Sequence, residues 1–71
     1  MDLTQNQTYQ ALKLQYEARK QKALANITVF LKAPVGVADH EDSMGSLMKL
    51  VEELASAEDV LYCLETNFEK D

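Results

Sequence analysis

The 71-residue chain contains few of the residues that build catalytic, metal-binding or disulfide-linked sites. It has no tryptophan, two glycines, one proline, one histidine (His40) and one cysteine (Cys63). A single cysteine forms no internal disulfide and holds no metal by itself, which is typical of a reducing compartment. Glycine-rich phosphate loops and the motifs GxSxG, CxxC and HExxH are also missing. These absences predict a protein that is not an enzyme and that has no cofactor.

Long hydrophobic runs are missing as well. No stretch approaches the ~18 apolar residues of a membrane span, and the first residues, "MDLTQNQT", lack the basic start and apolar run of a signal peptide. We therefore expect a soluble, cytoplasmic protein with no membrane contact.

Acidic residues outnumber basic ones, and the two signs are separated along the chain. The net charge is −5, with a balance of +3 over residues 1–33 and −8 over residues 34–71. This split favours two halves that lie side by side, and the acidic net charge argues against nucleic-acid binding. An acidic half that imitates a nucleic-acid backbone stays open as an alternative.

Two long segments have the apolar spacing of amphipathic helices. In residues 4–33 nothing breaks a helix, and apolar side chains recur at steps of three, four or seven: Tyr9, Leu12, Tyr16, Ala23, Ile27 and Phe30. In residues 43–68 the steps are three or four throughout: Leu47, Val51, Leu54, Ala57, Leu61, Leu64 and Phe68. Residues 69–71 are expected to fray.

These segments predict an all-α fold, a single domain over residues 1–71. The helices, at about 4–33 and 43–68, are joined by a turn at 34–42 and form an antiparallel two-helix hairpin. Each helix offers the other one narrow line of contact, which leaves the shoulders of both stripes exposed. We therefore expect self-association, through coiled-coil packing, into a homodimeric four-helix bundle or a higher oligomer.

The apolar stripes supply the predicted partner or oligomer interface. It consists of Tyr9, Leu12, Tyr16, Ile27, Phe30, Leu47, Val51, Leu54, Leu61, Leu64 and Phe68. The basic run "ARKQKAL" supplies a candidate anion contact: Arg19, Lys20 and Lys22.

The segment "KAPVGVADHEDS" is predicted to be the turn and the start of the second helix. Pro34 ends the first helix, and Gly36 allows a tight bend. Asp39 is the expected helix cap, with Asp42 three residues later, and His40 is the cap in an alternative register. A metal site at Asp39, His40 and Asp42 is not expected, because no second ligand cluster has the required spacing. A loop that contacts a partner stays open.

Residues 24–68 resemble small helical proteins of large contractile-tailed phages of the marine cyanophage type. The resemblance rests on a turn of the kind "NI.V.L.NPVG.GEH.D", followed by a helix with "A.AED.L..LE..F". The matching residues are Asn26, Ile27, Pro34, Val35, Gly36, His40, Asp42, Ala57, Glu58, Asp59, Leu61 and Glu65. The chain departs from the pattern at Ala33, Ala38 and Asp39. The resemblance implies a phage origin and a place in the host cytoplasm, and it implies no mechanism.

Taken together, the sequence predicts a non-enzymatic protein-interaction module, a phage accessory protein that binds or inhibits a host protein. One alternative is an oligomer that sequesters a nucleotide or another anionic small molecule. Another is a minor virion or packaging component.

Overall fold

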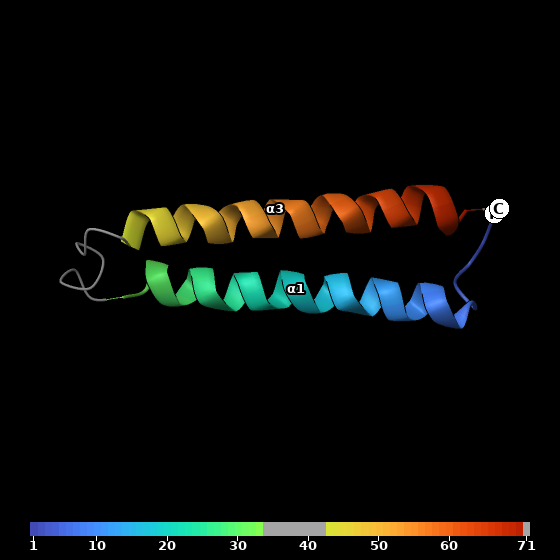
Figure 1. Cartoon of the computed structure of the whole chain (residues 1–71), viewed down its shortest axis with the longest axis horizontal. Coiled ribbons are helices and arrows are strands. Elements are labelled where there is room, and N and C mark those ends of the chain that lie inside the picture. The colour runs from blue at the N-terminus through green and yellow to red at the C-terminus, as the bar shows by residue number, and fades with distance from the viewer. Residues whose placement is uncertain (34–42, 71) are drawn as a thin grey trace.

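Two long helices lie side by side and run in opposite directions (Figure 1). The structure is a computed structural model that describes residues 1–33 and 43–70. Helix α1 spans Gln7–Leu31 and helix α3 spans Ser43–Phe68. The predicted all-α hairpin is therefore confirmed. The predicted turn and cap residues lie outside the described residues: Pro34, Gly36, Asp39, His40 and Asp42.

Helix α1 begins at Gln7, three residues later than the sequence predicts, because Asn6 caps it. The Asn6 backbone is extended, and its side-chain oxygen accepts a 2.9 Å hydrogen bond from the amide of Tyr9. Such a bond satisfies one of the free amides at a helix start. Thr4 instead bonds Asp2, through both its amide and its hydroxyl. Residues 1–6 therefore lie outside the helix.

The core is a single thin line of side chains along the contact between the helices. Among the described residues, six hydrophobic side chains are buried, with exposed fractions of 2–8%: Tyr9, Ala23, Ile27, Ala57, Leu61 and Leu64. The molecule measures 51 × 15 × 14 Å and has a radius of gyration of 15.9 Å. A compact domain of 71 residues would have a radius of about 11 Å. The chain is therefore a rod with a narrow interior.

The N-terminal residues return along the end of α3. The Leu3 amide donates a 2.6 Å hydrogen bond to the carbonyl of Phe68, and the N-terminal amine of Met1 donates one of 2.7 Å to the carbonyl of Lys70. Asp2 and Glu69 form an isolated antiparallel bridge. The expected fraying is therefore wrong for Glu69 and Lys70, because these long-range bonds hold the backbone there. Asp71 lies outside the described residues.

No helix in residues 1–33 or 43–70 combines the length and the apolar character needed to cross a bilayer.

Candidate functional site

The hairpin itself covers most of the residues predicted for a partner interface. Four are buried between α1 and α3: Tyr9, Ile27, Leu61 and Leu64. Five are half-buried: Tyr16, Phe30, Leu47, Leu54 and Phe68. Only Leu12 and Val51 are exposed, by 44% and 48%. Helical spacing marks which residues face an apolar neighbour, and it does not tell whether that neighbour belongs to the same chain.

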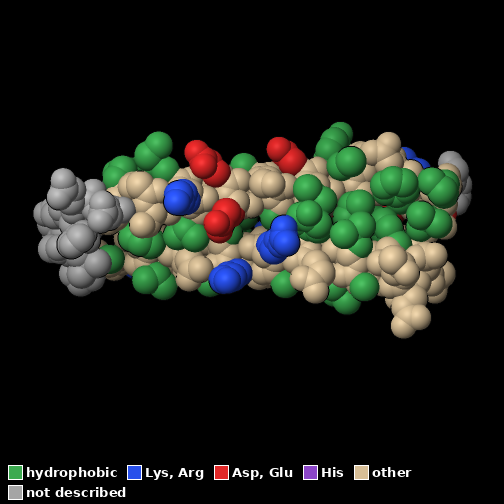
Figure 2. Space-filling view, in the orientation of Figure 1, with side chains coloured by type: hydrophobic (Ala, Val, Ile, Leu, Met, Phe, Trp, Pro, Cys, Tyr) green, Lys and Arg blue, Asp and Glu red, His purple; other side chains and the backbone are tan. Residues whose placement is uncertain are grey.

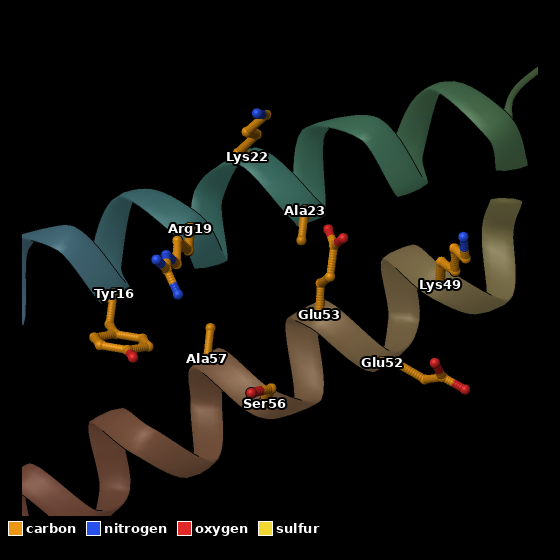
Figure 3. Close-up of a pocket in the computed structure, with 9 residues that line it drawn as sticks. All are labelled: Tyr16, Arg19, Lys22, Ala23, Lys49, Glu52, Glu53, Ser56 and Ala57. Atoms are coloured by element: carbon orange, nitrogen blue, oxygen red, sulfur yellow. The ribbon is translucent and has the colours of Figure 1, made fainter.

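A groove between the two helices lies at the middle of the rod. Its volume is about 510 Å³, and α1 and α3 both contribute to its lining: Tyr16, Arg19, Lys22, Ala23, Lys49, Glu52, Glu53, Ser56 and Ala57. Figure 3 shows Ala23 and Ala57 pointing into the space between the helices. Both alanines are 2% exposed. Because these side chains are small, the groove has an alanine floor.

Charged side chains of both signs surround this floor. Glu53 extends from α3 toward α1, whereas Lys22 and Glu52 extend outward from their helices (Figure 3). The Arg19 guanidinium lies 5.0 Å from the centre of the Tyr16 ring, within range of a cation–π interaction. On the face that Figure 2 shows, basic and acidic side chains lie intermixed over the middle of both helices.

Among the described residues, the charged groups of the groove have no ion-pair partner, whereas Lys13, Lys20, Glu58 and Glu65 on the opposite side of the hairpin are paired. Across residues 1–33 and 43–70, the ion pairs are Lys13–Glu65, Lys13–Glu69 and Lys20–Glu58. None of these involves a groove residue. Arg19, Lys22, Lys49, Glu52 and Glu53 are therefore free, within the described part of the chain, to pair with charges on another molecule.

The structure divides the predicted anion contact between two sides of the hairpin. Arg19 and Lys22 line the groove, whereas Lys20 lies 3.9 Å from Glu58, outside the groove lining. Lys49 joins Arg19 and Lys22 instead. Sequence reasoning missed Lys49 because it lies on the acidic helix. Its position could have been found only by fixing the register of α3 against α1.

A second cluster of polar groups joins the two ends of the chain. Glu69 accepts a hydrogen bond of 2.5 Å from the Tyr9 hydroxyl and one of 2.6 Å from the Lys13 ammonium. Lys13 also lies 3.7 Å from Glu65. The Tyr9 and Phe68 rings meet edge to face, with their centres 6.1 Å apart. A hollow of about 500 Å³ lies beside this terminal cluster.

The terminal cluster shifts the pKa of Glu69, Lys13 and Tyr9. The hydrogen bond from Lys13, followed by that from Tyr9, lowers the pKa of the Glu69 carboxyl from its ordinary value of 4.5. The same bond to Glu69 raises the pKa of Lys13. Burial, together with the bond to Glu69, raises the pKa of the Tyr9 phenol to about 12. Each group is therefore held in the protonation state that it has at neutral pH.

Because the pKa of Glu69 is lowered on folding, its contribution to stability is complete above pH 4.5 and is lost as the pH falls through the depressed value. We expect Glu69→Gln to lower the melting temperature by several degrees at pH 7, and by much less at pH 3. Thermal unfolding followed by circular dichroism at both pH values measures this. Glu53→Gln is the control, since Glu53 has no ion pair in the described residues. A difference in melting temperature between wild type and Glu69→Gln that is the same at pH 7 and pH 3 would contradict the expectation.

Metal-binding and thiol chemistry have little support in the described part of the chain. Residues 1–33 and 43–70 contain no group of three or more His, Cys, Asp or Glu residues placed to hold a metal ion. Cys63 is exposed, and the side-chain amide of Asn67 lies 3.5 Å from its sulfur. The groove is therefore the site with the most functional groups from both helices.

Comparison with known proteins gives no relative. The sequence matches no protein-family profile and no curated protein, and the structure matches no solved structure.

Proposed function

We propose that the chain is a non-enzymatic interaction module that binds another protein through the groove. The observation that carries this is the set of five charged side chains, three basic and two acidic, with no oppositely charged partner in the described residues. Charges of both signs in a fixed arrangement select a partner with the complementary pattern and raise its rate of association. The groove is thus suited to specific recognition.

The shape of the groove suits a helical segment of the partner protein. A third helix packs in the furrow between two antiparallel helices, and small side chains on the floor let it approach closely. Ala23 and Ala57 form such a floor. Under this proposal the partner's acidic residues meet Arg19 and Lys22, and its basic residues meet Glu53. The resemblance to phage proteins makes that partner a protein of the host cytoplasm.

A second candidate function is the binding of an anionic small molecule. The supporting observation is that Arg19, Lys22 and Lys49 come from two helices to one groove. Arginine and lysine are the usual ligands of phosphate groups. Glu52 and Glu53 line the same groove and repel an anion, and for this reason we place this candidate second.

Charge reversal on the groove tests the protein-binding proposal. We expect the pair Arg19→Glu and Lys22→Glu to reduce capture of the partner from host lysate at least about tenfold, since like charges would then face each other. The control pair Lys32→Glu and Lys70→Glu changes the net charge equally, outside the groove lining. Quantitative mass spectrometry of crosslinked, captured proteins gives the ratio.

Two results would count against binding of a protein in the groove. The first is equal loss or equal retention of the captured protein for the groove pair and the control pair. The second is saturable binding of a nucleotide such as ATP that disappears in Arg19→Ala, with no protein captured. That second result would establish the anionic-ligand function instead.

A further inference from the structure

The rod exposes more surface than a stable monomer of its mass. Its accessible area is 5506 Å² for 8.0 kDa. Monomeric proteins of this mass expose about 4,450 Å². The excess is about 1,000 Å², and each partner in a standard protein interface gives up about 800 Å². The excess area of one copy is therefore comparable with the area that each copy would bury in a dimer.

Several exposed apolar side chains lie on the side of the hairpin that carries the ion pairs. The Lys20–Glu58 pair marks this side. Leu24 follows Lys20 by four residues and Leu31 follows Leu24 by seven, so both share its face of α1. On α3, Val51 precedes Glu58 by seven residues and Met44 precedes Val51 by seven. Their exposed fractions are 37% for Leu24, 69% for Leu31, 63% for Met44 and 48% for Val51.

We call this surface the apolar face. It consists of Leu24, Leu31, Met44, Leu47, Val51 and Leu54, of which Leu47 and Leu54 are half-buried. It occupies only the half of the rod that is remote from the chain termini. Toward the termini, the same side carries the Lys13–Glu65 and Lys20–Glu58 ion pairs, together with Tyr62, which follows Glu58 by four residues and is 70% exposed. The side is thus mainly apolar at one end and mainly charged at the other.

This unequal distribution selects one arrangement of two copies. Oligomers of identical chains commonly form twofold dimers in which the same patch meets itself. If the twofold axis runs along the rod, the two apolar faces meet and the two ion-paired halves meet. If the axis runs across the rod, each apolar face lies against the charged half of the other copy, which desolvates charges against leucine and methionine.

The charges of the helices select the same arrangement. On the side of the hairpin that carries the ion pairs, the paired residues of α1 are basic, Lys13 and Lys20, and those of α3 are acidic, Glu58 and Glu65. An axis along the rod places α1 of each copy over α3 of the other, so that opposite charges meet. An axis across the rod stacks α1 on α1 and α3 on α3, so that like charges meet.

We propose that a second copy of this chain covers the apolar face, with the twofold axis along the rod and the termini of both copies at the same end. In the resulting four-helix bundle, every neighbouring pair of helices is antiparallel. Helical spacing places the groove on the opposite side of the hairpin from the apolar face. Each dimer therefore presents two grooves outward, and the proposal does not depend on what the groove binds.

The first test is the mass of the full chain in solution. We expect sedimentation equilibrium between 5 and 200 µM to give about 16 kDa, twice the 8.0 kDa of one copy. Val51→Glu should raise the dimer dissociation constant at least about 100-fold, because the twofold interface would hold two uncompensated carboxylates. Val29→Glu is the matched control: Val29 is more exposed, at 69%, but it lies off the apolar face.

A second variant keeps the test decisive if Val51→Glu loses helical structure by circular dichroism. Leu31→Glu changes a side chain that is 69% exposed and contributes little to the interior of one copy. It should also give a folded monomer. A wild-type monomer at 200 µM would overturn the proposal, and so would a dimer that survives Leu31→Glu or is lost equally in Val29→Glu.

The arrangement is tested by the distance between spin labels. Lys70→Cys in a Cys63→Ser background places one label at the terminal end of each copy. The proposed arrangement predicts a separation below about 25 Å, since neighbouring helices in a bundle lie about 10 Å apart. An axis across the rod would give about 40 Å or more, because α3 alone is about 39 Å long. Double electron–electron resonance distinguishes the two, and the longer distance would overturn the proposed axis.

Discussion

Leu61→Ala is expected to lower the free energy of unfolding by about 2–5 kcal/mol, the range for removing a buried leucine side chain. Leu61 is 6% exposed and lies in the single line of buried side chains between α1 and α3. A 71-residue domain has a total stability of roughly 4–11 kcal/mol. This one substitution should therefore remove a large share of that stability, because residues 1–33 and 43–70 form no second layer of core that supports the contact.

Leu14→Ala is the matched control, since Leu14 is 68% exposed on α1. The same chemical change there should alter stability by less than about 0.5 kcal/mol. Urea unfolding followed by circular dichroism measures both variants, and the protein concentration must be held constant because self-association adds to apparent stability. Similar losses for the two variants would mean that the buried line between the helices is not the main source of stability.

Ala57→Leu is expected to destabilise the hairpin by about 1–3 kcal/mol for the opposite reason, since it adds volume where the helices meet. Ala57 is 2% exposed and points into the space between α1 and α3. Leucine has nearly the helix propensity of alanine, so the effect comes from packing and not from the backbone. A leucine at this position must push the helices apart or turn into the groove.

Ala55→Leu provides the comparison, because Ala55 is exposed two residues away on the same helix. It should leave the midpoint of urea unfolding nearly unchanged. If Ala57→Leu were as stable as Ala55→Leu, the helices would have room between them at this point, and the alanine floor of the groove would not be closely packed.

Helical spacing was enough to predict the hairpin, because the stripes on α1 and α3 continue for the whole length of both helices. It was not enough to identify a partner surface. Ile27 and Leu64 have the spacing of an interface residue, yet one copy of the chain already buries them. In an antiparallel pair, contact within a chain and contact between chains produce the same period.

The polar sites depended on information that a sequence pattern does not contain. The groove needs Lys49 opposite Arg19, and this follows only from the register of the two helices. The terminal cluster depends on Glu69. Its position near the end of the chain predicted fraying, whereas Tyr9 and Lys13 both donate hydrogen bonds to its carboxylate. Both sites join residues that are distant in sequence.

The order of the contacts along the rod also has a consequence for how the chain folds. Lys20 and Glu58 are 38 residues apart, Tyr9 and Glu69 are 60 apart, and Met1 and Lys70 are 69 apart. Sequence separation thus rises steadily from one end of the rod to the other. Each contact shortens the loop that the next one must close, so the entropy cost of closing the hairpin is divided into small steps. The contacts between the helices can therefore form in sequence, from the Lys20–Glu58 pair toward the chain termini, with the terminal cluster forming last.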